Sequence, residues 1–141
     1  MFRMVFGLFY NTPVIEGCSQ SELFRRFSQF MMERLNIRQA GVLKDGRLRV
    51  TLISRDTRYR RIINEDDMVT ALEETGVFQV TVARFSPRLS FTDQLQMTHN
   101  TDILAGLHGA GLTHLLFLPD WAELFEIFNC DDANCYKDLS R

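Results

Sequence analysis

The amino-acid sequence predicts an α/β domain built on a parallel sheet with flanking helices. Short apolar segments of strand length alternate along the chain with amphipathic segments of helical spacing, and this alternation is typical of a parallel sheet wrapped by helices. The 141 residues suffice for one domain with a real core. A net charge of −2 gives no reason to expect nucleic acid as a partner, and no apolar run reaches the length of a membrane span.

The amino-terminal third predicts a strand followed by a helix. Residues 3–10 are apolar and aromatic and end at a turn, as a first strand would. Ser19 with Glu22 forms a capping box, and the apolar residues behind it recur at helical spacing, so we expect a helix over 20–36. We expect the apolar stripe of this helix to lie in the core rather than to bind a ligand. The stripe comprises Leu23, Phe24, Phe27, Phe30, Met31 and Leu35.

A second strand and a second helix follow a turn at 44–46. Apolar and polar residues alternate over 47–54, which predicts a half-buried strand. Asn64 stands where an N-cap is expected before a helix over 65–75, and the acidic residues after it favour the helix start through the helix dipole. Gly76 suits the position just beyond this helix, because glycine adopts positive φ without strain.

The next part of the chain predicts a strand over 77–85 and a helix over 91–98. The strand is recognised by its apolar and β-branched residues, and a proline follows it. Ser90 with Asp93 forms a second capping box at the start of the helix.

An apolar strand over 102–107 then runs into the glycine-rich turn His108-Gly109-Ala110-Gly111 and a helix-like segment. Glycines let the backbone approach a phosphate, and N–H groups at a helix start carry partial positive charge. The alternative is a tight turn needed only for packing. A further short strand at 124–128 and a helix start at 131–141 complete the expected elements.

Three groups fall at the carboxyl ends of the predicted strands: Ser54-Arg55, the turn 108–111, and Glu126. Ligands of parallel sheets bind at this edge. Arg55 can hold phosphate oxygens through two N–H groups, and Glu126 can accept hydrogen bonds from ribose hydroxyls. The alternatives are a solvated surface position for Arg55 and an ion pair or a cap for Glu126. Taken together, the three groups suit a nucleoside diphosphate.

Other familiar motifs are absent from the sequence. There is no P-loop, no nucleophile elbow, and no glycine fingerprint after the first strand, which disfavours the competing hypothesis of a nicotinamide enzyme. Zinc is disfavoured because only two of the three cysteines are close together and no histidine follows at ligand spacing. We expect structural roles for His99 and His114, and a phosphate or sugar contact for His108.

The sequence resembles the extracellular-type O-GlcNAc transferases of glycosyltransferase family 61, an inverting group. The resemblance is carried chiefly by the signature His-Gly-Ala-Gly-Leu-Thr at 108–113 and its flanks, and it covers essentially the whole chain. The matching segments are 7–13, Ser54-Arg55, 60–65, 98–119, Phe125-Glu126, 129–130 and 135–136.

The resemblance implies a GT-B fold, in which two Rossmann-like domains face a cleft. Residues 1–141 would be a single but partial UDP-sugar-binding domain, the C-terminal of the two. The family transfers N-acetylglucosamine from UDP-GlcNAc to Ser or Thr hydroxyls of EGF-like domains in the endoplasmic reticulum lumen. Arg61 is an alternative to Arg60 as a diphosphate partner. The donor-binding residues implied by position are Arg55, Arg60, His108, Gly109, Ala110, Gly111, Leu112, Thr113 and Glu126.

The sequence departs from the family in length, and we expect the N-terminal domain and a C-terminal tail to be absent. The general base that an inverting displacement needs is either in the missing domain or His108 acting across the cleft. No carboxylate pair here suits Mn²⁺, so that ion would have to bridge the diphosphate from elsewhere. We expect this chain alone to bind UDP weakly and to transfer nothing. The alternative is a non-catalytic form that binds UDP-sugar or associates with the full enzyme.

The lumenal setting implied by the resemblance also bears on the cysteines. In an oxidising compartment, Cys130 and Cys135 either join each other or pair with parts that are absent here. Cys18 would then seek a partner in the missing domain.

Overall fold

The structure, a computed structural model, describes residues 22–41, 43–55, 57 and 61–127. No helix among these residues has the length and apolar character needed to cross a bilayer. Some predicted features lie outside the described residues: the strand over 3–10, the first capping box, Arg60, the helix start at 131–141, and Cys18, Cys130 and Cys135.

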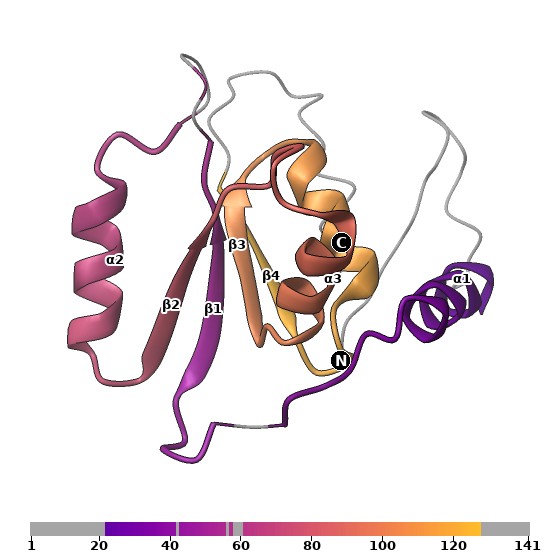
Figure 1. The fold of residues 1–141 in the computed structure, drawn as a ribbon. Helices are drawn as coiled ribbons and strands as arrows, with labels where there is room; N and C mark the ends of the chain where they lie inside the picture. Colours follow the sequence, from indigo (N-terminus) through magenta and orange to yellow (C-terminus); the bar gives the residue numbers. More distant parts are fainter. Residues whose placement is uncertain (1–21, 42, 56, 58–60, 128–141) are drawn as a thin grey trace, which may run out of the picture.

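Among the described residues four parallel strands form one sheet, which confirms the predicted α/β fold (Figure 1). The strand order is β2-β1-β3-β4, so the chain passes from β2 across β1 to β3. The direction of winding therefore reverses between β1 and β3, which makes that pair the topological switch point of the sheet. The strands are β1 (Leu48–Ile53), β2 (Phe78–Ala83), β3 (Ile103–Leu107) and β4 (Glu123–Ile127).

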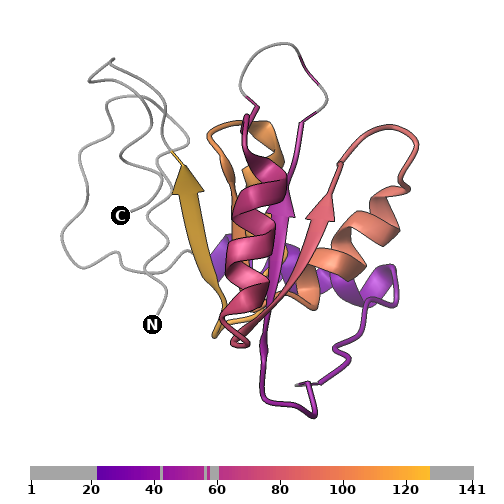
Figure 2. The same cartoon turned by 90° about the vertical axis from the view of Figure 1, so that its left-hand side faces the viewer.

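Helices cover both faces of the sheet (Figures 1 and 2). Helix α2 (Glu65–Glu74) covers one face, while α3 (Phe91–His99) and the 3₁₀ helix η1 (Ala110–Phe117) cover the other. This division follows from the strand order, because right-handed crossovers that run in opposite directions leave their helices on opposite faces. Helix α1 (Glu22–Arg34) lies beyond η1 and contacts it.

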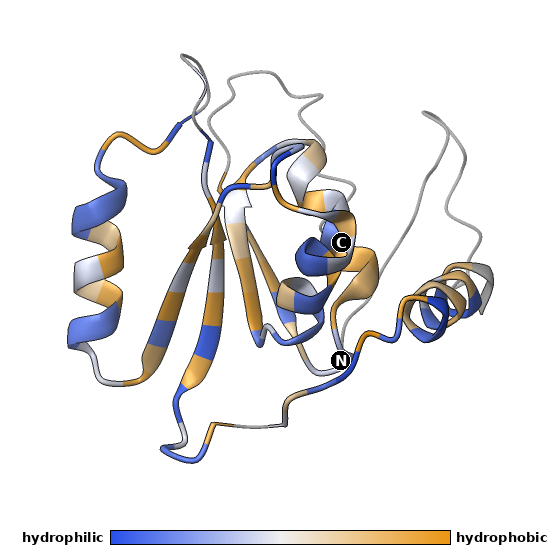
Figure 3. Ribbon diagram, viewed as in Figure 1, coloured by the Kyte–Doolittle hydropathy of each residue, from blue (hydrophilic) through white to orange (hydrophobic). Residues whose placement is uncertain are grey.

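Alternate residues of the central strands supply two apolar layers, and Figure 3 shows the apolar bands on these strands. Val50 and Leu52 pack with residues of α2 on one side. Ile53 and Leu104 pack with Leu112 of η1 on the other side. Leu52 and Leu104 are 1% and 0% exposed, so each contributes about 1.5–3 kcal/mol by burial.

Two glycines allow η1 to approach the sheet closely. A Cβ on Gly106 of β3 would lie 3.2 Å from the Cβ of Ile53, and one on Gly111 of η1 would lie 3.1 Å from the Cγ2 of Ile53. Both distances are tighter than ordinary van der Waals contact. The packing explanation that the sequence left open for the glycine turn therefore holds for Gly111.

Helix α1 forms as predicted, but the prediction that its aromatic stripe is buried is wrong in part. Phe27 and Phe30 are 46% and 57% exposed. Met31 and Leu35 instead pack against a small cluster that includes Phe117 of η1. The physical reason is that α1 packs chiefly against η1, so the shared surface covers less than the full stripe.

The helix boundaries of α2 and α3 show one cap that forms and one that does not. The Oγ of Ser90 accepts from the backbone N–H of Asp93 at 3.1 Å, which confirms the N-cap half of the predicted capping box of α3, while the Asp93 carboxylate accepts from the Ser90 hydroxyl at 2.6 Å. Asn64 occupies the N-cap position of α2, but its side chain makes no capping hydrogen bond, so that prediction is wrong. Its φ of −105° and ψ of 43° lie outside the extended region that side-chain capping requires. Gly76 has φ +69° just after α2, as predicted.

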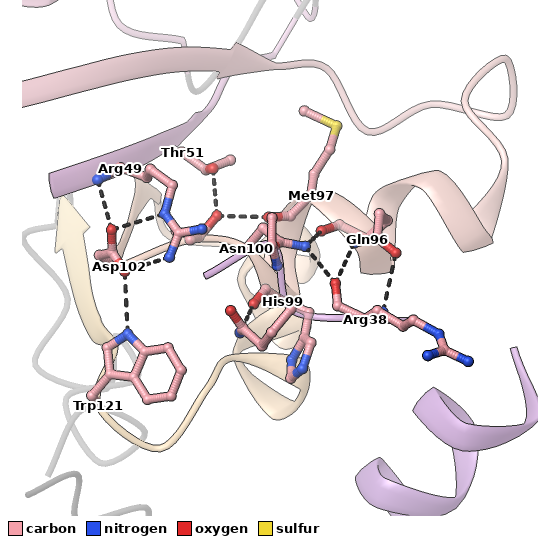
Figure 4. Close-up of polar contacts among 12 residues, drawn as sticks. Arg38, Arg49, Thr51, Gln96, Met97, His99, Asn100, Asp102 and Trp121 are labelled. Carbon is pink, nitrogen blue, oxygen red and sulfur yellow. Dashed lines mark hydrogen bonds and ion pairs between the residues drawn. The ribbon is translucent and has the colours of Figure 1, made fainter. Parts of the chain in front are cut away.

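A partly buried ion pair joins β1 to the start of β3, at the edge of the sheet where the strands begin (Figure 4). Asp102 Oδ2 accepts from the backbone N–H of Arg49 at 2.8 Å and from its Nε at 3.0 Å, and Oδ1 accepts from Nη2 at 2.8 Å. The indole N–H of Trp121 donates to the same carboxylate at 3.2 Å. The side chains of Arg49 and Asp102 are only 13% and 11% exposed, so the pair is well shielded from solvent.

A second polar set, also drawn in Figure 4, links β1 to α3 and to the chain before β1. The hydroxyls of Thr51 and Thr101 are 2.6 Å apart, and Thr101 donates to the carbonyl of Met97 in α3. Asn100 donates to the carbonyl of Arg38 at 3.0 Å. These contacts join the loop after α1 to the end of α3.

We expect Asp102→Asn to lower the free energy of unfolding by about 2 kcal/mol at pH 7, because Arg49 loses its charged partner. The hydrogen bonds from Arg49 lower the pKa of Asp102 from 3.8 to about 2. Because this pKa lies below its unfolded value of about 3.9, the stabilisation is complete above that value and is lost as the pH falls through about 2. Urea denaturation at pH 7, 4 and 2 measures the difference.

Asp45→Asn is the matched control, because Asp45 pairs with Arg47 on the surface. It should change the free energy of unfolding far less than Asp102→Asn does. An equal effect of the two substitutions at pH 7, or a difference that persists unchanged at pH 2, would contradict the role given to the buried pair.

Candidate functional site

The switch point between β1 and β3 brings together the residues that follow these two strands. Ser54-Arg55 follow β1, and His108 and Gly109 follow β3. In open α/β sheets the loops that leave the two switch-point strands diverge, and ligands bind in the crevice between them. This edge of the sheet is opposite to the one that holds the Arg49–Asp102 pair.

The guanidinium of Arg55 lies against the backbone of Gly109. A Cβ at this glycine would overlap Nη2 of Arg55, and its φ of +152° with ψ of 178° is a conformation open essentially to glycine alone. Gly109 is therefore needed for its backbone shape, and a Cβ there would also push aside the end of the Arg55 side chain. This contact places a positive charge at the switch point.

Backbone N–H groups gather beside this charge at the start of η1. The first hydrogen bond of the turn runs from the amide of Leu112 to the carbonyl of Gly109 at 2.9 Å. The amides of Ala110 and Gly111 precede it, so they belong to the donors that a helix start leaves for an anion. Thr113 is exposed, and its hydroxyl donates to Ala110.

Glu126 and His108 meet at the carboxyl ends of β4 and β3. The Nδ1 of His108 contacts the Oε1 of Glu126, and the two side chains are 22% and 6% exposed. The sequence left open an ion pair or a cap for Glu126; the structure shows a contact with a histidine, which is an ion pair only when His108 is protonated. Its hydrogen bond to a ribose hydroxyl stays a prediction.

His114 contacts the backbone of the glycine turn and an aromatic side chain, which confirms a structural position for this histidine. Its Nδ1 lies 3.0 Å from the carbonyl oxygen of Gly111, and its ring lies 4.4 Å from that of Phe85. Burial lowers the pKa of His114, and the hydrogen bond with Gly111 opposes this shift. His99 is also placed structurally, with Nδ1 3.0 Å from the carbonyl oxygen of Phe117.

A further polar group beside Arg55 could not be found from the sequence. The buried hydroxyl of Ser54 donates to Oε1 of Glu65 at 2.9 Å, and Nη2 of Arg84 lies 3.6 Å from the same oxygen. Glu65 was expected only to favour the start of α2. Ser54 follows β1, Glu65 begins α2 and Arg84 follows β2. No spacing in the sequence indicates that these three side chains meet.

The structure thus brings most of the predicted site residues to one edge of the sheet, with two exceptions. Leu112 is 5% exposed and belongs to the core, so its side chain does not reach the crevice. Arg60 lies outside the described residues, and Arg61 is exposed. Among the described residues no group of three or more His, Cys, Asp or Glu could hold a metal ion.

Fold and site together define a doubly wound α/β domain whose switch point carries an arginine and a glycine-lined helix start, the type of site that binds phosphate groups. The profile of the family described as glycosyltransferase 61 matches residues 9–125. The chain belongs to this glycosyltransferase family.

Individual relatives agree with the family match. The chain is 58% identical over 140 residues to the EGF domain-specific O-linked N-acetylglucosamine transferase of Mus musculus. It is 58% identical to the protein of the same name from Rattus norvegicus and 56% identical to that from Pan troglodytes, again over 140 residues. Each alignment covers 99% of this chain and 26% of the relative, so the chain spans about a quarter of their length.

We expect Gly109→Ala to lower the free energy of unfolding by about 1–3 kcal/mol, because alanine cannot adopt this φ without strain and its Cβ displaces Arg55. Gly46→Ala is the control, since Gly46 also has positive φ, at +75°, but nothing lies within 4 Å of a Cβ there. Chemical denaturation of both variants measures the difference. The assignment fails if the two substitutions cost the same.

Proposed function

We propose that this domain is the donor-binding part of a protein O-GlcNAc transferase. In this proposal it binds UDP-GlcNAc, and N-acetylglucosamine passes with inversion to Ser or Thr hydroxyls of EGF-like domains. The proposal is supported by the family match and by relatives whose names specify EGF domains and O-linked N-acetylglucosamine transfer. The observation that carries the donor site is the contact between Arg55 and Gly109 at the switch point.

The diphosphate fits this edge of the sheet on physical grounds. Arg55 offers a planar pair of N–H donors that match two phosphate oxygens, and the amides of Ala110 and Gly111 add neutral donors at the positive end of η1. His108 lies next to these donors. We therefore assign the diphosphate to the turn 108–111 and to Arg55, with Arg60 or Arg61 as an outer contact.

Three finer features belong to the same proposal. The domain would face a second Rossmann-like domain across a GT-B cleft, and that second domain would hold the acceptor. The general base would either belong to the second domain or be His108. The enzyme would work in the lumen of the endoplasmic reticulum. If Mn²⁺ takes part, it would bridge the diphosphate with ligands from another part of the protein, because the described residues hold no suitable cluster.

Calorimetric titration of the chain with UDP tests the donor site. Arg55→Ala should weaken UDP binding by about 10–100-fold, because it removes charge-assisted hydrogen bonds worth about 1.5–3 kcal/mol. The matched control is Arg34→Ala, which removes an exposed arginine at the end of α1 and should leave the affinity unchanged.

Two results would contradict the proposal. One is UDP affinity that survives Arg55→Ala, and the other is binding of NADH with an affinity equal to that for UDP. UDP-GlcNAc titrated in parallel shows whether the sugar adds affinity beyond that of the diphosphate.

A further inference from the structure

Glu126 is a buried carboxylate at the edge of the crevice. In the register of β3 and β4 it lies beside Gly106, and Gly106 faces Ile53 and Leu112. Its side chain is only 6% exposed. A carboxylate in such a place is costly unless a hydrogen-bond donor faces it. The imidazole of His108 faces it.

The contact fixes the state of the histidine ring. An ionised carboxylate has no proton to donate, so the proton between Oε1 of Glu126 and Nδ1 of His108 belongs to Nδ1. A neutral His108 is then the tautomer whose acceptor nitrogen is Nε2, and the contact also sets the direction of the ring plane.

We infer that Glu126 is a positioning residue that acts on the bound nucleotide through His108 rather than by a direct contact with ribose. This inference rests on the proposed function, because it assigns a role within the same donor site. His108 adjoins Gly109, against which Arg55 lies. Holding its ring in one orientation therefore prepares the site before the ligand arrives.

Nitrogen-15 NMR of the imidazole tests the contact without any ligand. In the unaltered chain the neutral His108 ring should carry its proton on Nδ1. In Glu126→Leu, which fills a similar volume without an acceptor, the ring should shift towards the Nε2–H tautomer. In Glu126→Gln the amide oxygen can still accept from Nδ1–H, so the Nδ1–H tautomer should be largely retained. Unchanged tautomers in Glu126→Leu would overturn the inference.

A double-mutant cycle on UDP affinity tests the role in binding. We expect Glu126→Leu and His108→Ala each to weaken UDP binding by about 10-fold, and the double variant to lose no more than His108→Ala alone. We expect Glu126→Gln to restore most of the loss. Losses that multiply to about 100-fold would show that Glu126 contacts the ligand independently of His108, and would overturn the inference.

The controls separate this inference from the proposed function. Glu123→Leu alters an exposed glutamate on the same strand and should leave both the tautomer and UDP affinity unchanged. If the unaltered chain does not bind UDP, the proposed function fails, while the NMR measurement still decides the His108–Glu126 contact. If Arg55→Ala abolishes binding but Glu126→Leu does not weaken it, only the positioning role fails. Circular dichroism confirms folding, and Glu126→Ala, which also removes the acceptor, provides the reading if Glu126→Leu does not fold.

Discussion

The packing of Ile53 against Gly106 and Gly111 is the constraint on which the site depends. Two missing side chains let η1 lie against β1 and β3 at a distance that leaves less than ordinary van der Waals space for a Cβ. Because η1 is held there, the turn that begins it stands directly over the end of β1. Arg55 follows Ile53 by two residues, and its guanidinium consequently reaches Gly109. An apolar contact in the core thus sets the place of the positive charge in the crevice.

The two ends of the sheet have different roles: one holds the strands in register, and the other carries the candidate site. At the end where the strands begin, Asp102 is satisfied by three N–H groups of Arg49 and by Trp121, and this fixes β3 against β1. At the other end the polar side chains of Arg55, His108 and Glu126 follow or end different strands. The amides at the start of η1 add hydrogen-bond donors there. A register held firmly at one end allows the opposite end to carry glycines and charged side chains that would by themselves weaken the sheet.

For the described residues, the sequence predicted the element order and the meeting of three strand ends, because alternating strands and helices imply a parallel sheet and parallel strands end at one edge. It did not determine the strand order, since several orders are compatible with the same alternation. It also missed the partners of Ser54 and the support that His114 gives to Gly111, because these contacts join residues distant in sequence through particular side-chain rotamers. The aromatic stripe of α1 shows the same limit, since periodicity indicates an apolar face but not how much of it a neighbour covers.

The glycine turn has the packing role that its sequence left open, and its anion-binding role stays a prediction. Gly111 serves packing, whereas Gly109 serves the backbone shape and the space taken by Arg55. The most direct test of the resulting account is amide NMR mapping during titration of the chain with UDP. The account predicts saturable shifts at Arg55 and at Gly109 to Gly111, with Asp102 and Trp121 at the opposite edge unmoved. Shifts confined to Asp102 and Trp121, or none at the turn, would contradict it.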